Sequence, residues 1–159
     1  MSKSVKRVEE AAAAAGLDTE IKRMGASTRT AEEAAAQCGC AVDQIVKSLI
    51  FEGKETGELF LFLVPGSKKL DLTRAAALCE EALVRADPRK VREKTGFAIG
   101  GVSPIGHKSP IRCIADRTLL AYEQVWAAAG APDAVFSSNP ADLLRAAQAE
   151  VADLTEIPA

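Results

Sequence analysis

Residues 45–64 read IVKSLIFEGKETGELFLFLV, which is two β-rich runs joined by a polar stretch. Branched and aromatic side chains dominate the runs at 45–52 and 59–64, and such residues favour strands. The connection at 53–58 holds two glycines among charged and polar residues, as hairpin connections do. The stretch therefore predicts a β-hairpin.

Helix and strand patterns alternate irregularly along the rest of the chain. Thr30-Ala31-Glu32-Glu33 has the form of a capping box, and both Asp87-Pro88 and Asn139-Pro140 place a capping side chain before a proline. Periodicity and these caps predict helices at 5–15, 30–37, 71–82, 87–94 and 139–149, and strands at 19–24, 111–115, 124–128, 134–137 and 151–155. The sequence has no internal repeat or low-complexity linker, so we expect a single domain spanning residues 1–159, of the α/β (α+β) class with a mixed sheet.

The composition is that of a folded, globular protein. Apolar residues make up 48% of the 159 residues and charged residues 26%, which is too apolar for a disordered chain. No apolar run approaches the roughly 20 residues that a membrane helix needs, and residues 1–10 hold no signal-peptide core. We expect a cytoplasmic protein with no membrane partner.

Cysteine and histidine usage argues against a metal centre. The chain has four cysteines, Cys38, Cys40, Cys79 and Cys113, and a single histidine, His107. Only Cys38 and Cys40 are close in sequence, and metal sites usually need more closely spaced ligands than this. We expect reduced, mostly buried thiols, no metal and no cofactor.

Charge is unevenly distributed, although the net charge is only −2. Residues 85–108 hold six basic and two acidic side chains, whereas residues 116–159 hold two basic and seven acidic ones. The overall balance does not indicate a general nucleic-acid binder, and no DNA partner is expected. The basic run is either a solvated helix face or, because it precedes a glycine-rich loop, a surface that faces phosphate.

The glycine-rich loop at 99–107 reads IGGVSPIGH and ends in the only histidine. Its glycines let the backbone approach a ligand closely, and Pro104 fixes the local chain direction. Such a loop can present backbone N–H groups to a negatively charged oxygen. His107 could exchange a proton or contact a ribose hydroxyl, although a lone histidine is more often structural.

Lys47 interrupts the apolar run at 45–51. On a strand, the period of two places Lys47 on the same face as Ile45, Leu49 and Phe51. A buried ammonium needs a partner, a route to water or a bound anion. Lys47 is therefore either a ligand-binding residue or an edge-strand lysine whose amine reaches solvent.

Several common catalytic motifs are missing from the sequence. Ser103 lies in Gly-Val-Ser-Pro-Ile rather than in a G-x-S-x-G elbow, and there is neither a P-loop nor a dinucleotide-binding G-x-G-x-x-G. ATP- or NAD-driven chemistry is therefore not indicated. Hydrolysis by an activated water, helped by backbone donors and a lysine, fits the remaining residues better.

The chain resembles the YbaK/ProX family of trans-editing aminoacyl-tRNA deacylases, which are free-standing relatives of the editing domain of bacterial prolyl-tRNA synthetase. The resemblance covers nearly the whole chain and rests on three motifs in order: TAEEAA at 30–35, IVKSL at 45–49 and GGVSPIG at 100–106. It implies a YbaK-like fold with a mostly antiparallel sheet surrounded by helices. It also implies hydrolysis of the ester that joins a wrong amino acid to the 3′ end of a tRNA.

The resemblance assigns roles to individual residues. Lys47 matches the family's key lysine, expected near the terminal adenosine or its phosphate, and residues 100–104 match a G-x-x-x-P loop that positions the aminoacyl carbonyl and stabilises its oxyanion. Ser48 stands at a variable position expected to influence amino-acid choice, and Gly130 matches a glycine that helps to wall the pocket. The expected catalytic residues are thus Lys47, Gly100 and Gly101, and the expected substrate-binding residues are Ser48, Val102, Ser103, Pro104, Gly106, His107 and Gly130.

Two other functions compete with deacylation of mischarged tRNA. In the first, the pocket only binds the acceptor end of tRNA or a nucleotide, beside a synthetase. In the second, the protein hydrolyses a small ester or thioester. This function would give the basic residues at 85–108 no role. The resemblance implies tRNA for proline and prolyl-tRNA synthetase as partners. It leaves the removed amino acid open among alanine, serine, threonine, cysteine and 2-aminobutyrate.

Overall fold

The hairpin predicted at residues 45–64 forms the middle of the larger of two sheets. β2 (Val46–Gly53) and β3 (Leu59–Pro65) pair in antiparallel register, with Ser48 opposite Leu63. The side chains of β3 alternate between two apolar clusters, and every residue of β3 is buried. Because β3 is covered on both faces, its sequence is apolar without interruption.

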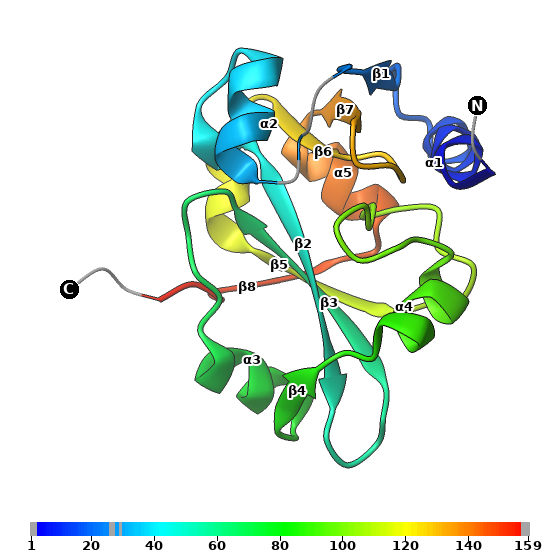
Figure 1. The fold of residues 1–159 in the computed structure, drawn as a ribbon. Coiled ribbons are helices and arrows are strands. Elements are labelled where there is room, and N and C mark those ends of the chain that lie inside the picture. The colour runs from blue at the N-terminus through cyan, green and yellow to red at the C-terminus, as the bar shows by residue number, and fades with distance from the viewer. Residues whose placement is uncertain (1–2, 26–27, 29, 157–159) are drawn as a thin grey trace.

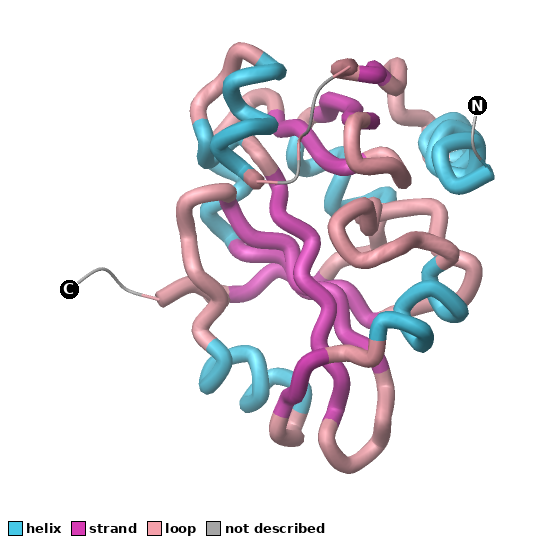
Figure 2. Tube along the Cα trace, viewed as in Figure 1, coloured by secondary structure: helices cyan, strands magenta, loops and turns pink. Residues whose placement is uncertain are grey.

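The computed structural model describes residues 3–25, 28 and 30–156 (Figure 1). The helices are α1 (Lys3–Ala14), α2 (Ala31–Cys38), α3 (Leu72–Cys79), α4 (Pro88–Thr95) and α5 (Pro140–Ala146), with short 3-10 helices at η1 (Val42–Gln44) and η2 (Arg117–Ala121). The other strands are β1 (Lys22–Arg23), β4 (Leu83–Arg85), β5 (Arg112–Asp116), β6 (Val125–Ala128), β7 (Ala134–Ser138) and β8 (Glu150–Ala152). Figure 2 shows the strands running through the middle of the molecule with helices around them. None of the helices in this described part is long and apolar enough to cross a membrane.

The strands are divided between two sheets, where the sequence suggested one. The larger sheet has the order β4-β2-β3-β5-β8, with antiparallel pairs from β4 to β3 and parallel pairs from β3 to β8. The smaller sheet, β1-β7-β6, is antiparallel. A parallel bridge between Ile45 and Trp126 joins it to the start of β2. Mixed but mainly antiparallel pairing, with helices around the sheets, confirms the predicted fold class.

Several predicted elements are shorter than expected, among them the strand predicted at 151–155, of which β8 (Glu150–Ala152) includes only two residues. The helix predicted at 71–82 ends early, because Glu80 adopts a left-handed conformation (φ 61°) and the following residues form β4 at the sheet edge. The helix predicted at 139–149 also ends early, and a second left-handed residue, Gln148 (φ 53°), leads into β8. Of the strand predicted at 19–24, only the two residues of β1 pair.

α2 begins and ends where the sequence predicts. Thr30 Oγ1 accepts a hydrogen bond from the Glu33 N–H at 3.0 Å, and Gly39 closes the helix with a left-handed φ of 67°. The buried alanines of α2 pack against Ile45 and Trp126 in one apolar cluster. This contact places the start of α2 beside the start of β2.

Candidate functional site

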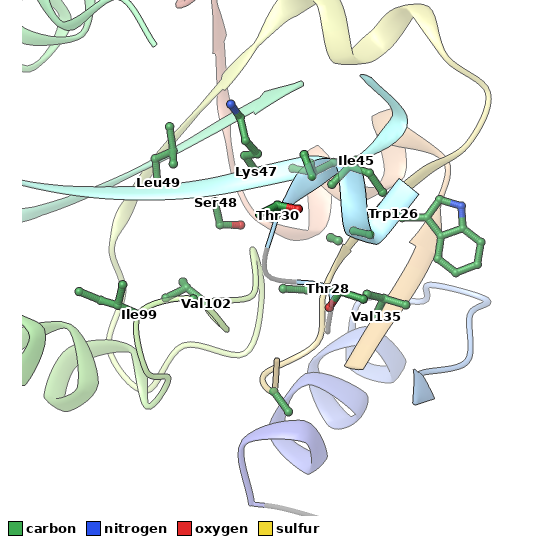
Figure 3. Close-up of a pocket in the computed structure, with 17 residues that line it drawn as sticks. Thr28, Thr30, Ile45, Lys47, Ser48, Leu49, Ile99, Val102, Trp126 and Val135 are labelled. Atoms are coloured by element: carbon green, nitrogen blue, oxygen red, sulfur yellow. The ribbon is translucent and has the colours of Figure 1, made fainter. Parts of the chain in front are cut away.

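A cavity of about 370 Å³ lies where α2, the start of β2, the glycine-rich loop and the smaller sheet meet (Figure 3). Its walls are mainly aliphatic, with alanines from α2 and β6 and with Val102 and Val135. Thr28, Thr30 and Ser48 supply hydroxyl groups. A mostly apolar cavity with a few polar groups is the usual form of a small-molecule site.

Ser48 carries the most informative polar group of the cavity. Its Oγ is buried and has no hydrogen-bond partner in the described part of the chain. Figure 3 shows the hydroxyl on the side of β2 that faces Val102 and Ile99. Leaving a hydroxyl buried and unpaired costs about 1–3 kcal/mol. The Ser48 hydroxyl is therefore available to a bound molecule.

Lys47 extends from the opposite side of β2 from Ser48 (Figure 3), as the alternation of a strand requires. Its Nζ donates a hydrogen bond to the Lys68 carbonyl at 2.6 Å. Partial burial lowers the pKa of the Lys47 amine, while the carboxylates of Glu32 and Asp43 act in the opposite direction. Lys47 lines the cavity, but its amine points away from the glycine-rich loop.

Two residues of the glycine-rich loop that line the cavity have backbone N–H groups without a partner in the described chain. Gly100 and Val102 both line the cavity, and neither N–H donates to an acceptor among the described residues. The Gly101 N–H between them is already used, in a 3.0 Å hydrogen bond to the Ala98 carbonyl. Gly100 has a φ of 96°, a conformation that favours glycine. Gly100 and Val102 therefore keep backbone donors that a bound oxygen could use, whereas the donor of Gly101 is taken.

The second half of the loop turns inward. Ser103 and Pro104 are buried, and Ser103 Oγ accepts a hydrogen bond from the Ile105 N–H at 3.3 Å. His107 Nε2 donates to the Ser103 carbonyl at 2.7 Å, and its ring packs edge-on against Phe97 with the ring centroids 5.9 Å apart. Burial lowers the pKa of His107, while the contact with the Ser103 carbonyl raises it. These contacts give His107 a structural role in holding the loop.

Gly106 and Gly130 allow close contact with α1. A Cβ on Gly106 would lie 3.1 Å from the Arg7 carbonyl oxygen, and one on Gly130 would lie 2.9 Å from the Ser4 carbonyl oxygen. The Arg7 guanidinium in turn donates to the Gly96 carbonyl at 2.6 Å and to the Gly106 carbonyl at 3.3 Å. Both glycines therefore shape the loops behind the cavity.

The cavity brings together only some of the predicted site residues. Within the described chain, Lys47, Ser48, Gly100 and Val102 line it, whereas Gly101, Ser103, Pro104, Gly106, His107 and Gly130 do not. Sequence reasoning missed Thr28, Thr30 and Trp126, which also line it. From the sequence, Thr30 had a role only as a helix cap at the start of the TAEEAA motif, and Trp126 only as part of a strand. Neither pattern shows that α2 and β6 meet beside β2.

A second cavity, of about 440 Å³, adjoins the first. The two share the lining residues Ser48, Leu49, Ile99, Gly100 and Val102. The second cavity follows β2 past Phe51 to Arg85 and to Pro88 at the start of α4. Ile99 lines both cavities with a side chain that is 58% exposed. The two cavities together form a site with an apolar chamber at one end and Arg85 at the other.

Metal-ligating and thiol groups do not add to this site. Across residues 3–25, 28 and 30–156, no three His, Cys, Asp or Glu side chains are grouped so as to hold a metal ion. The four cysteines are free, with Cys79 and Cys113 buried and Cys38 and Cys40 half-buried. Burial raises the pKa of Cys113 to about 12 and that of Cys38 to about 11. Those two thiols are protonated at neutral pH and are not activated nucleophiles.

Comparisons with known proteins identify related editing domains. The sequence profile of the aminoacyl-tRNA editing domain matches residues 26–146. YwhH, an uncharacterized protein of Bacillus subtilis (strain 168), is 28% identical over 126 residues, which cover 79% of this chain and 80% of YwhH. The proline–tRNA ligase of Thermosipho melanesiensis is 36% identical over 92 residues, which cover 57% of this chain and 16% of the ligase.

The fold agrees with the sequence match. A solved structure of a proposed trans-editing enzyme for prolyl tRNA synthetase is 48% identical, covers 99% of each chain and has a TM-score of 0.91. The three motifs that carry the resemblance to the YbaK/ProX family lie inside the range that the sequence profile matches. Because the sequence profile matches most of this chain and the fold is shared throughout, the chain belongs to the aminoacyl-tRNA editing domain family.

Proposed function

We propose that this protein hydrolyses the ester bond of mischarged aminoacyl-tRNA as a trans-acting editing factor in the cytoplasm. Its proposed substrate is tRNA for proline that carries a small non-cognate amino acid. The observation that carries the proposal is that one cavity is lined by Gly100 and Val102, whose N–H groups are free in the described chain, and by Ser48, whose hydroxyl is unpartnered there. Similarity to proline–tRNA ligases and to the proposed trans-editing enzyme supports it.

In the proposed reaction, the Gly100 and Val102 N–H groups hold the ester carbonyl oxygen of the bound aminoacyl end. A water oxygen attacks the carbonyl carbon, the bond from that carbon to the ribose oxygen breaks, and the ribose oxygen takes up a proton as the amino acid leaves. Negative charge builds on the carbonyl oxygen during the attack, and preorganised N–H donors stabilise it. Because an aminoacyl ester is already activated, positioning and these donors suffice without a covalent intermediate.

The attacking water also has to lose a proton. Lys47 is the only titratable side chain among the described residues of the cavity wall, and its amine points away from the loop. We therefore assign the proton relay to the substrate itself, through the free hydroxyl of the terminal ribose. That assignment agrees with the absence of a Ser–His–Asp arrangement around Ser48, since the chain's one histidine is occupied with the Ser103 carbonyl.

Amino-acid choice is proposed to follow from the walls of the apolar chamber. Small side chains, among them Ala31, Ala34 and Ala127, line it together with Ser48. In such a chamber one methylene changes binding by roughly 1–3 kcal/mol. Selection by size and shape would spare the cognate prolyl ester, while the Ser48 hydroxyl would supply a polar contact for the group that enters.

Lys47 remains a predicted catalytic residue. In the free protein its amine is held by the Lys68 carbonyl, on the opposite side of β2 from the Ser48 hydroxyl. We propose that the flexible Lys47 side chain leaves this carbonyl to meet the phosphate of the terminal adenosine. Lys47→Ala is expected to abolish deacylation of mischarged tRNA while the protein still folds, because the variant loses only one polar contact. Full activity of Lys47→Ala would contradict this role.

A deacylation assay with the purified protein tests the proposed function. The substrates are proline tRNA charged with alanine, serine, threonine, cysteine or 2-aminobutyrate, and correctly charged prolyl-tRNA is the control. We expect cleavage of at least one mischarged tRNA and survival of prolyl-tRNA. The alternative is a tRNA-binding module without catalysis, which the outward direction of the Lys47 amine favours. Binding with no cleavage of any ester would support that alternative and overturn the proposal.

A further inference from the structure

Three neighbouring arginines lack the partners that the other described arginines have. Arg23, Arg74, Arg112, Arg117 and Arg145 pair with carboxylates, and Arg7 donates to backbone carbonyls. Arg85, Arg89 and Arg92 are exposed, and their guanidinium groups make no ion pair or hydrogen bond within the described chain. All three lie within one stretch of eight residues.

Arg89 and Arg92 share one flank of α4. Val91 is buried on the inner face of this helix, and a spacing of three residues places Arg89 and Arg92 side by side on its surface. Pro88, one turn before Arg92, lines the second cavity together with Arg85. Figure 1 shows β4 leading directly into α4. Arg85, Arg89 and Arg92, which we call the α4 flank, therefore extend from the wall of the second cavity onto the surface of the helix.

Acidic groups near the α4 flank do not neutralise it. The Asp87 carboxylate caps the helix and accepts a hydrogen bond from the Arg89 backbone N–H at 3.0 Å. Glu52 pairs with Lys90 at 3.6 Å. Glu93 is exposed and forms no ion pair in the described structure. The guanidinium groups of the α4 flank are thus left free for a partner that brings its own negative charge.

We propose that the α4 flank binds the phosphodiester backbone of the 3′ strand of the tRNA acceptor end. This inference rests on the proposed function, because it starts from an aminoacyl group held in the apolar chamber. Guanidinium groups match phosphate in charge and geometry. A helix of this length, eight residues, spans about 12 Å, so it can follow the strand beyond the terminal adenosine. The acceptor arm then reaches the site past α4.

The test measures binding of an uncharged RNA hairpin that copies the acceptor stem of proline tRNA and ends in CCA. Arg89→Gln/Arg92→Gln removes two charges from the α4 flank and leaves Arg85 at the cavity wall. Lys3→Gln/Lys6→Gln is the matched control, since it removes two exposed lysines from α1. Affinity is measured between about 50 and about 200 mM salt, where each phosphate contact contributes roughly 0.7–0.9 to the slope of log affinity against log salt. We expect the loss of affinity across this range to be about tenfold smaller for the arginine variant than for the native protein, and unchanged for the control.

Deacylation gives a second readout. On mischarged tRNA the arginine variant is expected to show a KM about tenfold higher with an unchanged kcat, and on the aminoacyl ester of adenosine alone it should equal the native protein. If the native protein cleaves neither ester, the proposed function fails, and the hairpin measurement still decides the role of the α4 flank. An arginine variant that binds the hairpin with native affinity and native salt slope would overturn the inference. A native protein that does not bind the hairpin at low salt would overturn it as well.

Discussion

Replacing Ser48 by alanine is expected to stabilise the free protein and to slow its reaction. Ser48 Oγ is buried with no partner among the described residues, and such a hydroxyl costs about 1–3 kcal/mol. Alanine removes the hydroxyl and leaves only a small void, so the free energy of unfolding is expected to rise by about 1 kcal/mol. For a chain of 159 residues, that change raises Tm by about 2–4 °C.

Ser103→Ala is the matched control for Ser48→Ala. Ser103 is also buried, but its Oγ accepts a hydrogen bond from the Ile105 N–H at 3.3 Å. Losing that acceptor leaves the N–H unpaired, so Ser103→Ala is expected to lower the free energy of unfolding by about 1–3 kcal/mol. Thermal unfolding followed by circular dichroism measures both changes.

Ser48→Ala is also expected to hydrolyse mischarged tRNA more slowly than the native protein. One neutral hydrogen bond to the substrate is worth about 0.5–1.5 kcal/mol, so kcat/KM on mischarged tRNA is expected to fall about threefold to tenfold. A variant that is less stable than the native protein would show that the hydroxyl has a partner in solution. A variant with undiminished kcat/KM would show that the hydroxyl does not meet the substrate. Either result refutes the reasoning from the buried, unpaired group.

Three further substitutions test the glycine-rich loop. Gly100→Ala places a side chain at a φ of 96° and is expected to displace the adjoining N–H donors. The kcat measured in the deacylation assay is then expected to fall about 100-fold. A native kcat would exclude the oxyanion role of these donors. Burial lowers the pKa of His107, so the folded state binds fewer protons than the unfolded state and stability falls as the pH falls below about 6.5. His107→Gln keeps a side-chain donor and should remove this part of the dependence of Tm on pH, whereas an unchanged profile would contradict the assignment. Arg7→Gln deprives the Gly96 and Gly106 carbonyls of their donor. Denaturant titration is expected to show a free energy of unfolding about 1–3 kcal/mol lower than that of the native protein. A native denaturation midpoint would show that the loop keeps its conformation without the Arg7 hydrogen bonds.

Features set by neighbouring residues could be predicted from the sequence. The Thr30 cap of α2 and its Gly39 stop depend on hydrogen bonds and a backbone conformation within one turn. The hairpin of β2 and β3 depends on two apolar runs and the polar residues between them. In each case the physical cause lies within a few residues, and the structure agrees with the prediction.

Features set by distant contacts could not be predicted. The edge strand β4 forms because Leu83 and its neighbours pair with the end of β2, and the local sequence pattern predicts no strand at these three residues. The placement of the smaller sheet beside the start of β2 depends on the bridge between Ile45 and Trp126, which are far apart in the sequence. The free N–H groups of the glycine-rich loop likewise depend on a turn to the Ala98 carbonyl that takes up the Gly101 N–H instead.

Lys47 and Ser48 are neighbours in the motif, and strand geometry separates them. Successive side chains of β2 leave opposite faces, so one chamber receives the side chain of only one of the two, and Ser48 is the one that faces it. Lys47 can meet the same substrate only outside the chamber, because the Lys68 carbonyl holds its amine on the other side of β2. A substrate that engages both residues must therefore extend beyond its aminoacyl group, as it does in the proposed reaction through the phosphate of the terminal adenosine. Lys47→Ala should then reduce kcat/KM on mischarged tRNA far more than on the aminoacyl ester of adenosine, which has no phosphate, whereas Ser48→Ala should reduce both by the same factor. Equal losses on the two substrates for Lys47→Ala would place the lysine inside the chamber during the reaction and contradict the strand geometry.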